Sequence, residues 1–225
     1  MRVTGYRRGV SPTEPAGYFS TRFAPDTRRD AVWRHVARHL AAHWQPGASI
    51  LDVGAGYCSF INAVEGAGRR VAVDLHEDLP AFAGAGVECV KASATDLSAL
   101  ADESFDVVFA SNLLEHLCRD DIVRSLDEFR RVLRAEGRLL LVQPNYRLCA
   151  RKYWDDYTHL TPLSDRSLSD LLRTRGFSLV EVQARFLPLT LKSSASKLTF
   201  LVPWYLRSPV RPLAGQMLLV ARRGE

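Results

Sequence analysis

Five short apolar runs recur along the first two thirds of the chain, separated by longer segments with helical patterns or polar residues. They cover residues 49–55, 69–75, 87–93, 105–111 and 137–145. The runs are mostly apolar on both faces, as in a parallel sheet that helices cover on each side. Two further runs, at 178–186 and 216–223, bring the number of expected strands to seven. The sequence therefore predicts an α/β fold: a Rossmann-like, doubly wound, mostly parallel seven-stranded sheet with helices on both faces and an antiparallel last strand.

Helical signals lie between these runs. After Arg119 an apolar stripe repeats at helical spacing, with two aspartates in the first turn and Gly137 beyond the expected end of the helix. A second helix is expected between residues 164 and 176. Residues 27–44 form a further helical pattern ahead of the first run.

The length of 225 residues suits one domain of ordinary α/β size. We expect an N-terminal strap and helix at 1–46, a cofactor-binding core at 47–145, and a substrate-side loop with the last two strands at 146–225. An unusually apolar insertion at 185–215 separates those two strands. The sequence leaves three interpretations of it open: a cap over the substrate pocket, a homodimer contact, or a peripheral contact with lipid.

The composition indicates a soluble globular protein, with 47% hydrophobic and 24% charged residues. Although the net charge is +5, no stretch holds the dense Lys/Arg run of a phosphate-tracking surface, so a nucleic-acid partner is not favoured. The four cysteines form no C-x-x-C pair, and no apolar run is long enough for a signal peptide or a membrane span. We therefore expect a cytoplasmic protein with reduced thiols and no transmembrane segment.

Two glycines, Gly54 and Gly56, follow the first run at the spacing of a cofactor-binding turn. A dinucleotide turn would place a third small residue at Ser59 and an apolar residue where Asp52 stands. An acid at that position instead suits S-adenosylmethionine (SAM), because it can organise the turn and meet the cationic amino group of the methionine moiety. The glycines then let the backbone approach the cofactor where a Cβ would collide.

Two more acids follow the next runs. Asp74 ends the second run, where a carboxylate can accept both ribose hydroxyls of either cofactor class. Asp96 lies just beyond the third run, where the acid or its neighbouring amide can meet an adenine amino group. A helix cap before residues 97–100 is an equal alternative for Asp96.

In this order the segments resemble the class I SAM-dependent methyltransferases, in particular the group related to ubiquinone methyltransferases and to enzymes of glycan and natural-product pathways. The matching segments lie within residues 48–145 and read "LDVGAGYCSF", "VDL", "SATDL", "FDVVFASNLLEHL" and "EFRRVLRAEGRLLLVQPN". Residues 57–59 depart from the resemblance, since many members carry a further glycine there. The resemblance implies SAM as cofactor, S-adenosyl-L-homocysteine (SAH) as product, and cofactor contacts from Asp52, Gly54, Gly56, Asp74, Asp96, Ser111 and Asn112.

The implied chemistry is a direct displacement at the sulfonium methyl group, helped mainly by alignment of the reactants in a dry pocket. A hydroxyl acceptor also needs a base, and histidine has a suitable pKa. His116 follows the fourth run and would lie near the methyl group, with a structural hydrogen-bonding role as the alternative. His159 lies between the fifth run and the next helix, at the sheet edge where α/β proteins bind ligands. Both are candidate catalytic residues.

Aromatic and acidic residues are concentrated beside His159, in the stretch "KYWDDYTHLTPLS". This mixture suits stacking and hydrogen bonding of a polar ring such as a sugar. A second aromatic group in the N-terminal strap, at 17–23, is either a packing element or a lid over cofactor and substrate. No metal site is expected, and ligation of a metal by His159 with Asp155 or Asp156 is a lesser alternative. The expected substrate contacts are Tyr18, Arg22, Tyr153, Trp154, Asp155, Asp156 and Tyr157.

We therefore predict a SAM-dependent methyltransferase that acts on a small molecule, at a hydroxyl group of a sugar or of a glycosylated or natural-product metabolite. Three alternatives stay open. An RNA methyltransferase fits the arginine content, although the Asn-Pro-Pro-Tyr-type motif of base N-methylators is absent from "SNLLEH". The others are a non-catalytic SAM-binding scaffold and a nicotinamide dehydrogenase.

Overall fold

The computed structural model describes residues 27–189 and 199–224, and their strands form one seven-stranded sheet in the order β3-β2-β1-β4-β5-β7-β6. Strands β1 to β5 run parallel, and β7 is antiparallel to both of its neighbours, β5 and β6. The predicted fold class is therefore confirmed. The strands are β1 (Ser49–Val53), β2 (Arg69–Asp74), β3 (Val87–Lys91), β4 (Phe105–Ser111), β5 (Leu133–Pro144), β6 (Phe177–Pro188) and β7 (Ala214–Arg223).

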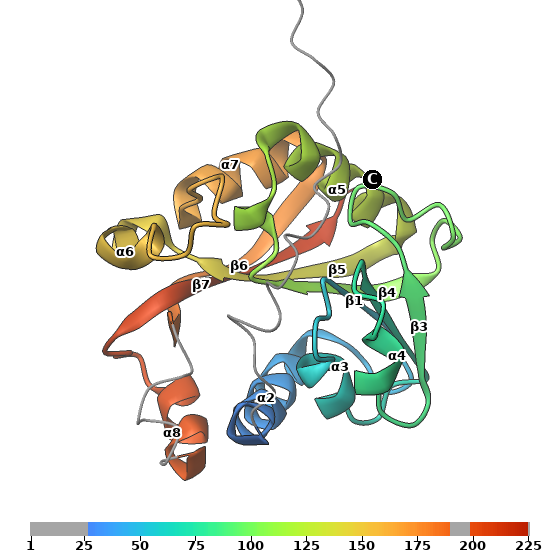
Figure 1. Ribbon diagram of the computed structural model, residues 1–225, viewed down its shortest axis with the longest axis horizontal. Helices are drawn as coiled ribbons and strands as arrows, with labels where there is room; N and C mark the ends of the chain where they lie inside the picture. The colour runs from blue at the N-terminus through green and yellow to red at the C-terminus, as the bar shows by residue number, and fades with distance from the viewer. Residues whose placement is uncertain (1–26, 190–198, 225) are drawn as a thin grey trace, which may run out of the picture.

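Helices cover both faces of the sheet. In Figure 1, α5, α6 and α7 lie above the sheet, and α2, α3, α4 and α8 lie below it. No helix of the described residues is both long enough and apolar enough to span a membrane. The helices are α2 (Thr27–Leu40), α3 (Ser59–Ala63), α4 (Leu79–Phe82), α5 (Arg119–Val132), α6 (Tyr146–Tyr153), α7 (Asp165–Thr174) and α8 (Val202–Arg207), with 3-10 turns η1 (Ala41–His43) and η2 (Leu114–His116).

Each strand supplies apolar side chains to two separate core layers. Leu51 of β1 belongs to the cluster that contains Phe129 of α5, whereas its neighbour Ile50 belongs to the cluster that contains Val36 of α2. Successive side chains of a strand point to opposite faces, so a strand buried on both faces is apolar throughout. This arrangement explains why the runs of the central strands are mostly apolar, whereas the edge strand β6 alternates between apolar and polar residues over much of its length.

The role that the sequence suggests for Gly137 as a helix terminator is wrong. α5 ends at Val132 and the chain passes directly into β5, so Gly137 lies inside that strand. The pairing of β4 with β5 is irregular at this point, and Glu136 takes a left-handed φ of +64°. A Cβ on Gly137 would lie 2.9 Å from the carbonyl oxygen of Arg134. The glycine therefore serves a bulge rather than a helix terminus.

Candidate functional site

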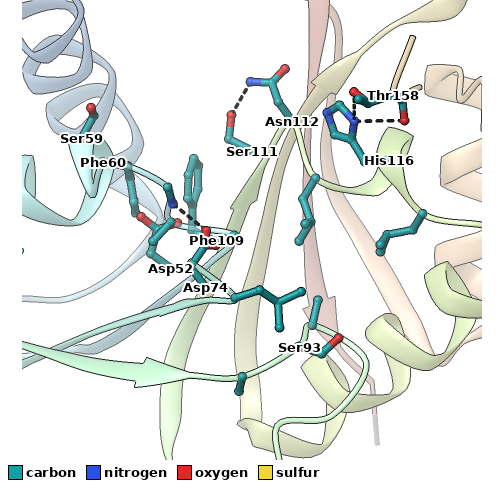
Figure 2. Close-up of a pocket in the computed structure, with 18 of the residues that line it drawn as sticks. Asp52, Ser59, Phe60, Asp74, Ser93, Phe109, Ser111, Asn112, His116 and Thr158 are labelled. Atoms are coloured by element: carbon teal, nitrogen blue, oxygen red, sulfur yellow. Dashed lines mark hydrogen bonds between the residues drawn. The ribbon is translucent and has the colours of Figure 1, made fainter. Parts of the chain in front are cut away.

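A pocket of about 440 Å³ opens at the carboxyl ends of β1, β2 and β4, and Figure 2 shows its lining. Strands β1 and β4 are neighbours in the sheet, but two strands separate them along the chain. At such a switch point the connections leave in opposite directions and open a crevice, where open α/β sheets bind ligands. The size lies within the range of small-molecule sites.

The glycine turn forms one wall of the pocket. Gly54 and Gly56 have φ values of +71° and +52°, a backbone conformation that disfavours a Cβ. A Cβ on Gly54 would also lie 3.0 Å from a methyl group of Leu113. Cys58 adopts φ +56° as well, with its side chain fully buried. It stands in the segment where the resemblance expects a further glycine, and it adopts the conformation that a glycine would favour.

Asp74 fastens this turn to the end of β2. Its Oδ2 accepts a hydrogen bond from the Gly56 N–H at 2.8 Å, and its Oδ1 accepts one from the His76 N–H at 3.0 Å. Asp74 also lines the pocket. The structure thus places the expected ribose acid directly beside the glycines.

Asp52 lies next to Asp74 in the pocket, as Figure 2 shows, and is only 3% exposed. Burial, followed by the nearby charge of Asp74, raises the pKa of Asp52 to about 8, although a backbone hydrogen bond from Ile61 opposes the shift. The ionised carboxylate is therefore unfavourable until a cation comes close.

The third strand contributes a different residue from the one expected. Residues 92–95 line the pocket, but Asp96 is exposed outside it. The Oδ1 atom of Asp96 accepts a hydrogen bond from the Ser98 N–H at 3.1 Å, and no helix follows at 97–100. The helix-cap interpretation is wrong, and the structure does not bring the Asp96 carboxylate to the pocket with the other expected cofactor residues.

Ser111 and Asn112 line the pocket at the end of β4. The Asn112 side chain donates a hydrogen bond to Ser111 Oγ at 2.9 Å and accepts one from Gln216 Nε2 at 2.8 Å. Gln216 is buried in β7. The last strand therefore holds a turn that belongs to the first half of the chain.

Helix α2 forms the wall opposite β4, through Arg29 and Trp33. The Trp33 ring packs edge-on against Phe60 and Phe109, with centroid distances of 6.1 and 5.9 Å. Its Nε1 atom is buried, with no hydrogen-bond partner in the part of the chain that the structure describes. The sequence analysis did not identify Arg29 and Trp33 as site residues. Their spacing of four residues, which places both on one helix face, was the available signal.

His116 also lines the pocket, and Figure 2 shows its contacts with Thr158. Its Nδ1 atom lies 3.0 Å from Thr158 Oγ1 and 3.3 Å from the Thr158 carbonyl oxygen. Because Thr158 Oγ1 donates to Asp156 at 2.6 Å, the Nδ1–H group of His116 is the donor to Thr158. Burial, followed by the proximity of His159, lowers the pKa of His116 to about 4.

His159 lies behind His116 and does not line the pocket, with 5.0 Å between the ring centroids. Its Nδ1–H group donates to the Tyr153 carbonyl oxygen at 2.6 Å. Sequence reasoning missed Glu115, which is 2% exposed and whose Oε2 atom has no hydrogen-bond partner among the described residues. Burial raises the pKa of Glu115 to about 8, although a backbone hydrogen bond opposes the shift, and the charge of Asp156 adds a smaller increase.

Of the expected substrate contacts that the structure describes, Tyr157 lines the pocket. Trp154 and Asp155 are exposed outside it, and Asp156 accepts the hydrogen bond from Thr158. The aromatic and acidic tract is therefore divided between the pocket and the solvent.

Tyr153 has a structural position. It is fully buried, and its hydroxyl group donates to the Thr161 carbonyl oxygen at 2.6 Å. The N–H groups of Leu160 and Thr161 donate to the Glu115 carbonyl oxygen at 2.8 and 3.1 Å. These backbone contacts hold the loop after α6 against η2.

The two flanking segments are placed in part. Tyr18 and Arg22 lie outside the described residues. No described residue of the insertion lines the pocket; instead α8 packs beside α2, and Phe200 and Trp204 are 66% and 75% exposed. The connection is shorter than expected, since β6 continues to Pro188 and β7 begins at Ala214. The described part of the insertion therefore gives no support to a cap over the pocket.

Residues 51–141 match the family model described as a methyltransferase domain. Among solved structures, a SAM-dependent methyltransferase from Archaeoglobus fulgidus is 20% identical with a TM-score of 0.66, covering 91% of this chain and 97% of that one. The 1,6-didemethyltoxoflavin-N1-methyltransferase of Burkholderia thailandensis, with bound 1,6-didemethyltoxoflavin and SAH, is 23% identical with a TM-score of 0.62, covering 93% and 85%. The cyclase SpnF is 18% identical with a TM-score of 0.63, covering 85% and 80%. No curated protein matches the chain.

Proposed function

We propose that this chain is a class I SAM-dependent methyltransferase that methylates a small molecule at a hydroxyl group. The observation that carries this proposal is the continuity of the pocket, which joins Asp52 and Asp74 to His116 and Tyr157. Cofactor and acceptor would then meet inside one pocket of small-molecule size. A sugar or a glycosylated or natural-product metabolite is the favoured acceptor, since Tyr157 offers a ring face at the mouth.

The cofactor end is assigned by charge. The ammonium group of SAM would lie at Asp52, where a cation relieves the cost of ionising a buried carboxyl group. The ribose hydroxyls would bind Asp74, and the adenine would lie along residues 92–95. The methionine carboxylate would face α2, where Arg29 supplies a cation and Trp33 supplies a buried N–H group.

The acceptor end follows from where the methyl group would then point. Leu113, Leu117 and Leu160 line the pocket around His116 and keep this end apolar. In the reaction the acceptor oxygen forms a bond to the methyl carbon while the carbon–sulfur bond breaks. The electron pair of the broken bond stays on sulfur, which gives SAH. The hydroxyl proton must leave as well, and we assign its loss to the end of the pocket that His116 lines.

The test is transfer of labelled methyl from SAM into a fractionated cell extract, with small molecules and lipids kept apart from RNA and protein. We expect label in the small-molecule fraction, in a product whose ether link survives mild base that would cleave a methyl ester. The matched control is the Asp74→Ala enzyme, which should label that fraction much less when SAM is kept below saturation. Label confined to RNA or protein would contradict the proposal, and tight SAM binding without transfer to any fraction would favour a non-catalytic role.

A further inference from the structure

Three side chains at the acceptor end form a compact set of donor atoms. Glu115 and His116 are consecutive residues of η2, and His159 comes from the loop after α6. One ligand atom from each lies within 4.8 Å of the other two, and His116 Nε2 lies 3.9 Å from Glu115 Oε1. Sequence-distant segments thus bring two imidazoles and one carboxyl group together.

Both imidazole rings are oriented by hydrogen bonds on the same nitrogen. The Nδ1–H group of His116 donates to Thr158, and that of His159 donates to the Tyr153 carbonyl oxygen. The lone pair of each neutral ring is therefore on Nε2. Fixing one ring nitrogen by a backbone or hydroxyl acceptor is the usual way in which a protein orients a metal-binding histidine.

Glu115 supplies an independent observation. The residue is 2% exposed, and its Oε2 atom is buried without a hydrogen-bond partner among the residues described. Such a group is costly to bury. Two imidazole nitrogens and a carboxylate oxygen are the ligands that divalent first-row transition metals take.

We propose that Glu115, His116 and His159 bind one divalent first-row transition-metal cation, such as Mn²⁺, Co²⁺ or Zn²⁺, which holds the acceptor hydroxyl beside the methyl group. Three protein ligands leave coordination positions open. Because His116 lines the pocket, a cation bound to it would lie at the pocket wall. The role toward the acceptor rests on the proposed function, whereas the cation site does not. Glu115 takes the place that the sequence interpretation gave to Asp155 or Asp156.

The cation would account for the loss of the hydroxyl proton. A hydroxyl bound to a divalent cation ionises at a lower pH than a free one and releases its proton to water. The resulting oxygen then attacks the methyl carbon, and the bonding pair departs with sulfur. The cation is neither oxidised nor reduced, so no further reactant is needed.

The first measurement is a titration of tag-free, metal-depleted protein with Co²⁺ and with Mn²⁺, followed by calorimetry and, for Co²⁺, by its visible absorption bands. We expect one cation per chain, with Glu115→Gln and His159→Asn each weakening its binding at least about tenfold. His35→Ala, which removes a histidine of α2 outside the pocket, is the matched control and should bind as the unaltered protein does. SAH binding by each variant shows whether its fold is intact.

The second measurement is methyl transfer with and without added cation. Stoichiometric binding that the two variants lose, together with transfer that depends on the cation, supports the inference. Absence of stoichiometric binding to protein that still binds SAH overturns the site, and so does binding that both variants retain. Transfer that is equal with and without cation overturns the role toward the acceptor. Failure to label any fraction under either condition counts against the proposed function, because the cation titration does not depend on an acceptor.

Discussion

Two neighbouring carboxyl groups in the pocket differ in how the protein holds them. Asp74 accepts hydrogen bonds from two backbone N–H groups and reaches the pocket at the tip of β2, whereas Asp52 is almost fully buried beneath the glycine turn. Burial disfavours the charged form of a carboxyl group. Asp52 is therefore the acid whose proton a bound cation can displace.

Substitutions of Asp74, which lines the pocket, and of Asp96, which does not, should affect SAH affinity differently. We expect Asp74→Ala to weaken SAH binding by about tenfold to a hundredfold, because a hydrogen bond to a charged group contributes roughly 1.5–3 kcal/mol. Asp96→Ala removes an exposed carboxylate outside the pocket and should change the affinity by less than about twofold. Calorimetric titration with SAH measures both, and equal losses in the two variants would contradict the placement of Asp96.

Asp52 should couple cofactor binding to proton release. Its pKa of about 8 in the folded protein, against 3.8 ordinarily, means that the cofactor-free protein keeps this proton up to about pH 8. A bound ammonium group lowers the pKa of Asp52. At a pH between that lowered pKa and about 8, binding therefore releases a proton. The affinity for SAM should rise with pH until about pH 8 and then level off. The same raised pKa makes the folded state, without cofactor, lose stability as pH rises from about 4 to 8.

Calorimetry at pH 7 in buffers of different ionisation enthalpy measures the released proton. In Asp52→Asn the amide cannot ionise, so the dependence on buffer should be lost. A proton count that is the same in the variant and in the unaltered protein would show that the proton comes from elsewhere.

At the scale of single elements, helix α2 links packing with binding. Val36 and Leu40 are fully buried in the core layer that also contains Ile50 of β1, while Arg29 and Trp33 of the same helix line the pocket. Two residues that line the pocket thus share one helix with residues that stabilise the fold. Ligand contacts on such an element should reduce its local opening.

We expect SAH to slow amide hydrogen exchange in α2 by at least about threefold at saturation, because a bound ligand lowers the population of opened states. Helix α7 lies on the other face of the sheet and contributes no residue to the pocket, so its exchange should change much less. Hydrogen exchange followed by mass spectrometry compares the two helices in one sample. Equal slowing in both would indicate global stabilisation without direct contact at α2.

The elements were predictable where local pattern and tertiary environment agree. β4 begins and ends at the predicted residues, and α7 begins at the Ser164–Ser167 capping box. The role of Gly137 and the early start of β5 at Leu133 were not predictable, because the glycine serves the β4–β5 pairing. That pairing depends on a partner strand about thirty residues upstream, which no local window contains.

At the scale of the whole molecule, the candidate site was predictable in its first half and less so in its second. The cofactor residues follow strand ends in chain order, so a parallel sheet brings them to one edge. Trp33, Glu115 and the division of the aromatic tract depend instead on how α2, η2 and the loop after α6 pack together. Composition could mark that tract as unusual but could not show which of its side chains face the pocket.

The exposed apolar surface on α8 should be separable from catalysis. Trp204 is 75% exposed and lies outside the pocket, so we expect Trp204→Ser to leave methyl transfer and SAH affinity unchanged and to shift the unfolding free energy by no more than about 0.5 kcal/mol. Transfer assays and thermal unfolding check this, with Trp33→Ser as the contrasting variant, which should lose both stability and ligand binding. A loss of transfer in Trp204→Ser would restore the interpretation of the insertion as a cap.

The loop after α6 is held mainly from its ends. The Tyr153 hydroxyl group donates to the Thr161 carbonyl oxygen and so joins the two ends of the loop, and the N–H groups of Leu160 and Thr161 donate to the backbone oxygen of Glu115. Backbone contacts of this kind tolerate exchange of the side chains between them. Substitutions at Tyr157, the residue of 154–157 that lines the pocket, can therefore alter which molecule the pocket accepts while the scaffold and the residues around Asp52 and Asp74 stay the same.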